Sequence, residues 1–322
     1  MAAPTWPEPH FVETNGIRMA VHETGTGMPV VFSHGWPELA YSWRHQLPAV
    51  AAAGFRAIAP DQRGYGLTDR PEKVEDYDMA HLTGDLVGLL DALGIEKAIF
   101  CGHDWGGLVV WQMPLYHPDR VAGVISLNTP FIPRAPADPI AIMKATMGDN
   151  MYIVYFQQYG VADALLKKDV RRVFETFMRT SPITYEQYLQ LPESDRKFEF
   201  IRMFEGDKPE FIPGTLILNE EELNFFVSTY ERTGFTGGIN WYRNFTRNWH
   251  ASEGIRERVD VPGLMISAAD DVVLPPVMAD GMEQYVPDLE RHIVPACGHW
   301  TQQEKPEETN RLIIDWLKRR FG

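Results

Sequence analysis

The chain has 322 residues, of which 44% are hydrophobic, enough to bury one large core or a core with a smaller lobe. Its 44 acidic and 30 basic side chains give a net charge of -14, which repels phosphate backbones and anionic membrane surfaces, so neither nucleic acid nor a membrane is an expected partner. The opening residues carry no basic patch before an apolar run, and no later segment is long enough to span a bilayer, which predicts a cytoplasmic protein.

The first half of the chain has the pattern of a mostly parallel sheet. Strand-like residues 11–14 and 17–21 flank Asn15-Gly16, the dipeptide that best tolerates the positive φ angles of a tight hairpin turn, which predicts an antiparallel opening pair. Short apolar runs then alternate with helix-like stretches, as in a sheet built of strand–helix units. The predicted strands cover residues 30–32, 57–59, 98–101 and 121–127, and the predicted helices lie near 42–53, 82–93 and 106–117.

Residues 134–248 break this alternation. A proline-rich entry at 133–139 leads into aromatic-rich, helix-like sequence with few strand signals. An insert of this kind between strand–helix units typically builds a binding lobe over the carboxyl ends of the strands, although it could instead extend the main core. We therefore expect a helical cap at 134–248, between two parts of one core at 1–133 and 249–322.

The sheet pattern returns after the insert. Strand-like runs at 264–267 and 291–294 are followed by a closing helix at about 306–320. The chain therefore reads as one catalytic unit of the α/β class, with a helical insert late in its sheet.

A candidate nucleophile lies where the predicted strand at 98–101 meets a helix. The segment Gly102-His103-Asp104-Trp105-Gly106-Gly107 has the strand, glycine-bounded turn and helix of a nucleophile elbow. A tight strand–helix connection alone would explain the glycines. At the centre, where ester-cleaving enzymes have serine, this chain has Asp104, whose carboxylate can attack a saturated electrophilic carbon without first losing a proton. The alkyl ester so formed must then be hydrolysed by an activated water.

The base and its orienting acid are found near the end of the chain. Gly298-His299-Trp300 follows the last predicted strand, where a loop can bring an imidazole toward the elbow, so His299 is the candidate base. Asp270 and Asp271 follow the preceding strand, and one of them could accept the second imidazole proton. Two adjacent aspartates could also form a turn or a helix cap. The histidines within turns, His34 and His103, are adequately explained by packing.

Backbone N–H groups are also needed, because ester hydrolysis passes through a tetrahedral oxyanion. The segment His34-Gly35-Trp36-Pro37 follows the strand at 30–32, in the place of the second oxyanion loop of such enzymes. We expect the amides of Trp36 and Trp105 to supply the hole. Pro37 could follow a cis or a trans bond, and the sequence leaves both open.

The motifs at 34–37, 102–107 and 297–302 together resemble those of the soluble epoxide hydrolases in the α/β-hydrolase superfamily, and the match extends over nearly the whole chain. This resemblance implies an α/β-hydrolase fold and the hydrolysis of an epoxide to a diol. It also implies that the orienting acid is Asp271 rather than Asp270, because Asp271 begins the segment that matches that family's acid motif.

The resemblance further implies two cap phenols that bind the epoxide oxygen. Tyr152, in the segment 152–157, and Tyr242, in the segment 240–244, fall on those motifs, the second more closely, and Tyr155 remains an alternative to Tyr152. Opening an epoxide produces an alkoxide, which needs a proton at neutral pH, and a tyrosine with a pKa of about 10 keeps a proton to donate. Without the resemblance, packing would be the simpler explanation of any tyrosine in an aromatic lobe.

Two other activities and one non-catalytic role fit parts of the pattern. Haloalkane dehalogenases resemble the aspartate elbow, but a halide leaves without a proton, and that family usually has asparagine where this chain has Trp36. Fluoroacetate dehalogenases place arginine where this chain has Trp105, so the clamp for a substrate carboxylate is missing. A non-catalytic binding protein on the same fold would commonly have lost part of the site, whereas here every part is present.

The expected site needs no metal or organic cofactor, because carboxylate, imidazole and phenols supply nucleophile, base and acid. The only two cysteines, Cys101 and Cys297, have no metal-ligand or disulfide spacing and are expected to be buried thiols. Phe, Met and Trp residues in the insert predict an apolar epoxide as the small-molecule partner, although the same residues could instead form the core of the lobe. The natural epoxide and the oligomeric state are left open.

Overall fold

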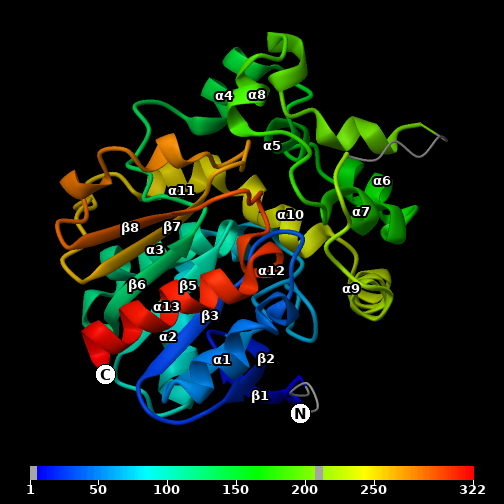
Figure 1. Cartoon of the computed structure of the whole chain (residues 1–322). Helices are drawn as coiled ribbons and strands as arrows, with labels where there is room; N and C mark the ends of the chain where they lie inside the picture. Colours follow the sequence, from blue (N-terminus) through cyan, green and yellow to red (C-terminus); the bar gives the residue numbers. More distant parts are fainter. Residues whose placement is uncertain (1–5, 207–212) are drawn as a thin grey trace.

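The computed structural model describes residues 6–206 and 213–322 (Figure 1). Residues 1–5, part of the opening segment on which the expected cytoplasmic location rests, lie outside this range. The described residues form a sheet in the order β1-β2-β4-β3-β5-β6-β7-β8, in which β1, β2 and β4 pair antiparallel and all other pairs are parallel. The strands are β1 His10–Thr14, β2 Ile17–Thr24, β3 Pro29–Ser33, β4 Arg56–Pro60, β5 Ala98–His103, β6 Val121–Leu127, β7 Gly263–Ala268 and β8 Leu289–Val294.

The opening hairpin is confirmed. Strands β1 and β2 pair through Thr14 and Ile17, and the two residues between them have positive φ, 45° at Asn15 and 78° at Gly16. A two-residue turn with positive φ at both positions matches the right-handed twist of the strands that it joins.

Both faces of the sheet are covered by helices. Because side chains alternate along a strand, Val31 and Phe100 join one core cluster while Val30 and Phe32 join the other. Helices α2 (Met79–Ala92) and α3 (Trp105–Tyr116) pack on the first face, and α1 (Gln46–Ala52) and α13 (Pro306–Phe321) on the second. Every residue of β5 is buried, as expected for a central parallel strand.

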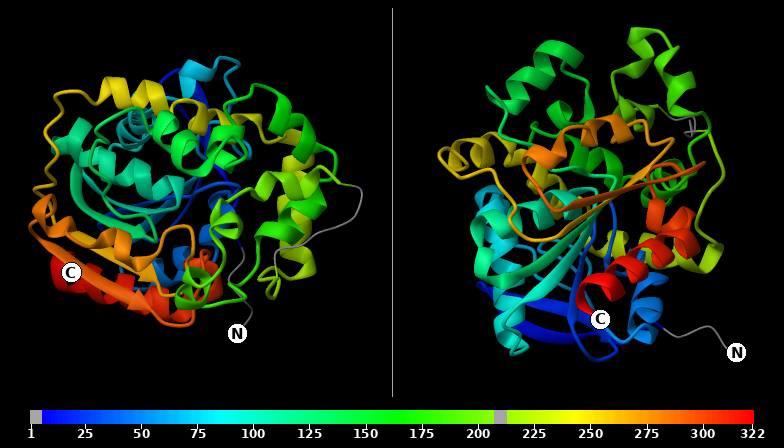
Figure 2. Two further views of the ribbon diagram at one scale, coloured as in Figure 1. Left: turned by 90° about the horizontal axis from the view of Figure 1, so that it is seen from above. Right: turned by 60° about the vertical axis from the view of Figure 1, so that its left-hand side comes forward.

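The predicted helical insert joins β6 to β7. In Figures 1 and 2 its helices gather beyond one end of the sheet rather than on either face. The last of them runs past residue 248, where the sequence placed the boundary. The helices are α4 Pro139–Met147, α5 Tyr152–Tyr155, α6 Val161–Lys167, α7 Val170–Phe177, α8 Tyr185–Leu189, α9 Glu220–Thr233, α10 Thr236–Arg243 and α11 Phe245–Ala251.

The fold places four loops at one edge of the sheet. They follow the carboxyl ends of β3, β5, β7 and β8, which are parallel neighbours or next neighbours. In open α/β sheets this edge is where ligands bind. Across the described part of the chain, no helix is both long and apolar enough to cross a membrane. Cys101 and Cys297 are both buried free thiols, as expected.

Candidate active site

Asp104 lies at a sharp turn between β5 and α3. Its backbone has φ 52° and ψ -121°, a conformation that non-glycine residues seldom adopt and that is often retained at functional sites. The neighbouring glycines allow the turn: a Cβ on Gly102 would clash with the carbonyl oxygen of Gly106, and a Cβ on Gly106 with that of Ser33. The side chain of Asp104 is thereby presented above the sheet edge.

Two backbone amides hold the Asp104 carboxylate. The N–H of Trp36 donates to Oδ1 at 2.8 Å, and the N–H of Trp105 also donates to this carboxylate. Burial raises the pKa of Asp104, while nearby His299 and the two amides act in the opposite direction. The peptide bond between Trp36 and Pro37 is cis, which the sequence left open. The amides of both tryptophans therefore lie beside the Asp104 carboxylate.

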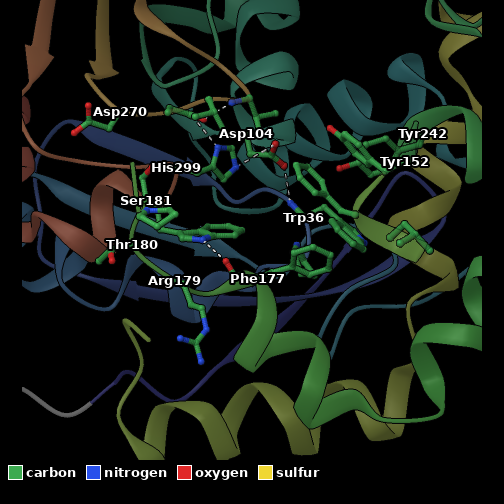
Figure 3. Close-up of a pocket in the computed structure, with 18 residues that line it drawn as sticks. Trp36, Asp104, Tyr152, Phe177, Arg179, Thr180, Ser181, Tyr242, Asp270 and His299 are labelled. Carbon is green, nitrogen blue, oxygen red and sulfur yellow. Dashed lines mark hydrogen bonds and ion pairs between the residues drawn. The ribbon is translucent and has the colours of Figure 1, made fainter. Parts of the chain in front are cut away.

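His299 lies between two carboxylates. Its Nδ1 is 2.9 Å from Oδ2 of Asp271, and its Nε2 is 3.7 Å from Oδ2 of Asp104 (Figure 3). Burial opposes charge on the imidazole, but Asp271, with smaller contributions from Asp104 and Glu38, outweighs it and raises the pKa of His299 to about 9.

The structure separates the two candidate acids. Asp271 is fully buried, and its Oδ1 accepts the N–H groups of Val273 at 2.9 Å and Leu274 at 3.1 Å. Burial opposes its charge, yet His299, a hydrogen bond from Asn128 and the N–H of Leu274 lower the pKa of Asp271 to about 2. Asp270 points its backbone N–H at the carbonyl of Cys297 and is only partly buried. Asp271 is therefore the residue that contacts the imidazole.

Asn128 supports Asp271 and was missed by the sequence analysis. Its Nδ2 donates to Oδ2 of Asp271 at 2.7 Å, and its own Oδ1 accepts from the hydroxyl of Thr301 at 2.6 Å. It follows β6 with φ 63°, a conformation for which asparagine is enriched. A polar residue directly after a buried strand was the only available signal.

A second buried network of hydrogen bonds lies next to the loop that carries His299. His103 belongs to it, so this histidine does more than fill space in the core. The ring of His103 bonds Glu38 at 2.7 Å through Nδ1 and the carbonyl of His299 at 2.7 Å through Nε2. Glu38 is fully buried and also accepts from the amides of Gln302 and Gln303. His103 must donate through Nε2 to that carbonyl, so the network fixes the backbone of the candidate base. Glu38 lies outside every motif of the sequence that predicted a site residue, apart from being next to Pro37.

The two candidate phenols come together from separate helices. Tyr152 begins α5 and Tyr242 lies in α10, and their ring centroids are 5.8 Å apart. Figure 3 shows both hydroxyl ends on the side that faces Asp104, opposite His299. Burial, followed by the charge of Asp104, raises the pKa of both phenols, so both remain protonated at neutral pH.

Two further residues in or just after α5, Tyr155 and Gln157, form side-chain hydrogen bonds. The hydroxyl of Tyr155 bonds Glu205 at 3.3 Å, and Tyr155 does not line the cavities beside Asp104, so the structure favours Tyr152 as the phenol of the site. The side-chain amide of Gln157 donates to the carbonyls of Ile153 and Tyr242 at 2.9 and 3.0 Å. Gln157 thereby ties α5 to α10, a role that the sequence gave no means to recognise.

Two cavities meet at Asp104, Tyr152 and Tyr242. We call the smaller, of about 150 Å³, the narrow branch, and the larger, of about 570 Å³, the wide branch. The narrow branch is lined by Phe177, Pro182 and Trp300 among others, and the wide branch by methionine, leucine and aromatic side chains of the insert. A substrate held by the phenols can thus extend in two directions over mainly apolar walls.

Similar proteins are found along nearly the whole chain. The profile of the alpha/beta hydrolase fold matches residues 28–306. The chain is 42% identical to epoxide hydrolase A of Mycobacterium tuberculosis, covering 98% of each protein. It is also 42% identical to the bifunctional epoxide hydrolase 2 of Sus scrofa, covering 94% of this chain but 54% of that protein. The chain thus spans about half the length of this mammalian relative.

A solved structure agrees with these relatives. The crystal structure of epoxide hydrolase A from Mycobacterium thermoresistibile matches with a TM-score of 0.85 and 42% identity, covering 97% of this chain and 98% of that one.

Proposed function

This chain belongs to the epoxide hydrolases of the α/β-hydrolase family, and on that premise we propose that it converts an epoxide to a vicinal diol through a covalent ester on Asp104. The observation that supports this mechanism is the position of one carboxylate between an imidazole and two protonated phenols. A nucleophile, a base and an acid then face a single point in the cavity.

In the first step Asp104 attacks a ring carbon of the epoxide. Its Oδ1 is held by the N–H of Trp36, which leaves Oδ2 to form the new carbon–oxygen bond. The ring carbon–oxygen bond breaks, and the alkoxide takes a proton from Tyr152 or Tyr242. The products are a hydroxyalkyl ester and a tyrosinate.

In the second step the ester is hydrolysed. His299 removes a proton from water, the hydroxide adds to the ester carbonyl, and the amides of Trp36 and Trp105 stabilise the oxyanion. Collapse of this intermediate expels the second diol oxygen, which takes the proton from the imidazolium. The proton of the resulting Asp104 acid returns to the tyrosinate, and the enzyme is restored.

The electrostatics link the two steps. In the resting state Asp104 is one of the charges that raise the pKa of His299 to about 9. Ester formation neutralises Asp104, so the pKa of His299 falls when its role changes from ion-pair partner to base. After alkylation the imidazolium therefore loses its proton to solvent more readily, and the neutral imidazole that remains is the form that can accept a proton from water.

The haloalkane dehalogenase alternative makes less use of this site. A halide leaves as a stable anion, so it needs hydrogen-bond donors but no proton. Two phenols facing Asp104, both with a raised pKa, are matched to an alkoxide leaving group.

The remaining assignments are part of the same proposal. Residues 134–248 act as the cap over the site, the epoxide is apolar, and the protein works in the cytoplasm. The apolar lining of both branches supports the choice of substrate.

The decisive experiment separates the two steps. In His299→Gln, Asp104 can still be alkylated but no base activates water, so an ester should accumulate. After addition of styrene oxide, intact-protein mass spectrometry should show a mass increase equal to the whole epoxide, and peptide mapping should place it on Asp104. Asp271→Asn should accumulate less of it, because the imidazole remains but loses its partner.

The matched control is Asp104→Asn in the His299→Gln background, which should form no adduct. Rapid diol formation by His299→Gln without labelling of Asp104 would overturn the mechanism.

A further inference from the structure

A third cavity adjoins the wide branch, and we call it the side cavity. Its volume is about 330 Å³, and it lies between α3, the residues after β6, α4 and α11. Asp104 and the two candidate phenols do not line it, so the proposed reaction makes no use of this space. The wall that it shares with the wide branch consists of Trp105, Leu108, Ile132, Met143 and Phe245.

Much of the side cavity is apolar. Leu115, Phe131 and Ile142 line it but do not line the wide branch. An apolar cavity of about 150 Å³ is already large enough to hold benzene, and pockets that bind small molecules begin at about 300 Å³. The side cavity therefore has room for a benzene ring that carries a short polar group.

Two opposite charges, on Arg134 and Glu257, line the same cavity without pairing. The guanidinium carbon of Arg134 lies 4.3 Å from the centroid of the Trp249 ring, and its Nε donates to the Trp249 carbonyl at 3.1 Å. The carboxylate of Glu257 accepts the backbone N–H of Arg134. Within residues 6–206 and 213–322, neither charge has an opposite charge within ion-pairing distance, and the neighbouring Arg258 pairs with Asp260 instead. Both groups thus keep hydrogen-bonding capacity for a ligand.

These two charges select the chemistry of the ligand. An anion would be repelled by Glu257, and a cation by Arg134. A neutral group that both donates and accepts hydrogen bonds can satisfy both charges at once. Two hydroxyls on adjacent carbons do so, because one can donate to the carboxylate while the other accepts from the guanidinium, and hydrogen bonds to charged groups are the stronger kind.

We propose that the side cavity binds a vicinal diol, with the apolar group of the diol against Leu115 and Phe131 and its hydroxyls on Arg134 and Glu257. This inference rests on the proposed function, because the diol is then the product that forms across the shared wall. A diol held there leaves the nucleophile uncovered, since Asp104 lines the wide and narrow branches and not the side cavity.

The test measures diol binding while the reaction centre is covered. The His299→Gln variant is first labelled with styrene oxide, so that the ester occupies Asp104. It is then titrated with phenylethanediol, the hydrolysis product of styrene oxide, by isothermal titration calorimetry, and one diol per chain should still bind. The dimethyl ether of this diol has no O–H to donate to Glu257, so it should bind about tenfold more weakly.

Further variants in the labelled His299→Gln protein assign the binding to the side cavity. Glu257→Gln keeps an oxygen for the N–H of Arg134 but loses the charge, so the dissociation constant of the diol should rise about tenfold. Leu115→Trp puts a larger side chain into the side cavity and should abolish binding. Glu253→Gln is the matched control, because it removes the same charge from an exposed residue of the same segment that does not line the cavity, so the dissociation constant should not change.

The outcomes distinguish this inference from the proposed function. If the labelled protein binds no diol, or if either Glu257→Gln or Leu115→Trp leaves the binding unchanged, the inference alone is overturned. Failure of styrene oxide to label Asp104 would overturn the proposed function and this inference with it, because no diol would then form beside the side cavity.

Discussion

At the residue scale, the proposed ring opening depends most specifically on two phenols, Tyr152 and Tyr242. An alkoxide must be protonated as the ring opens, and each phenol has its hydroxyl facing Asp104. Burial and the charge of Asp104 raise the pKa of both phenols, which keeps the proton available. The same pKa shift makes them weak acids, so a phenol gives up its proton only as the much more basic alkoxide forms.

Replacement of both phenols should remove this donor. The double variant Tyr152→Phe, Tyr242→Phe should lose epoxide turnover by about ten-thousandfold while keeping its circular dichroism spectrum, and each single variant should lose far less. Tyr155→Phe is the control, since its hydroxyl bonds Glu205 away from the site, and its rate should be nearly normal. Near-normal turnover by the double variant would contradict the assignment of the phenols.

At the scale of the element, the elbow depends on close contact between β5, α3 and the loop after β3. The Cα of Gly106 packs against the carbonyl of Ser33, so a methyl group there would meet backbone, which has no rotamer by which to move away. The position of Asp104 thus depends on a different residue, Gly106, having no side chain.

Gly106→Ala should therefore destabilise the protein strongly. We expect a loss of about 3 kcal/mol in the free energy of unfolding, measured by urea denaturation, with loss of turnover. Gly84→Ala is the control: it lies in α2, and the nearest atom to its new methyl group belongs to a side chain rather than to the backbone, the Nδ2 of Asn15 at 3.1 Å. A midpoint for Gly106→Ala equal to that of Gly84→Ala would show that the elbow tolerates the methyl group.

The elements that could be predicted from the sequence were those with local sequence signals. The strands, the Asn15-Gly16 hairpin and the helices of the core follow from periodicity and turn residues, and the structure confirms them. The elbow and the base loop were legible because their glycines and polar residues are consecutive in the chain.

The roles of residues that act through partners far away in the sequence could not be predicted. Glu38 accepts hydrogen bonds from His103 and from two glutamines more than 260 residues away. In the sequence it is an acidic residue after a proline, a pattern that by itself predicts a surface turn. Asn128 and Gln157 also act through long-range hydrogen bonds.

The end of the insert was placed inside α11, because no proline or glycine marks residue 248.

For the molecule as a whole, the charges of the site link folding to pH. The pKa of His299 is raised from 6.5 to about 9 on folding, so its contribution to stability is complete below pH 6.5 and is lost as pH rises through 9. The pKa of Asp271 is lowered from 3.8 to about 2, so its contribution is complete above pH 3.8 and is lost as pH falls through 2. Both contributions are complete between pH 3.8 and 6.5.

We therefore expect the melting temperature to fall as pH is raised from 6.5 to 9. The His299→Gln variant should fall less over the same interval, since the growing net negative charge acts on both proteins but only one has the titrating imidazole. Differential scanning calorimetry at matched ionic strength measures both slopes. Equal slopes would mean that His299 gains no proton affinity on folding.

The connection from β6 to β7 carries a consequence for how such a protein changes over generations. These strands are parallel neighbours, so a single short helix would satisfy the sheet where this chain inserts α4 to α11. Mutations, insertions and exchanges of coding sequence in that stretch leave the strand order and Asp104 itself untouched. Lineages that keep Tyr152 and Tyr242 can thus diversify the molecules that they admit while inheriting the elbow unchanged, and the stretch is a natural unit for recombination between related genes.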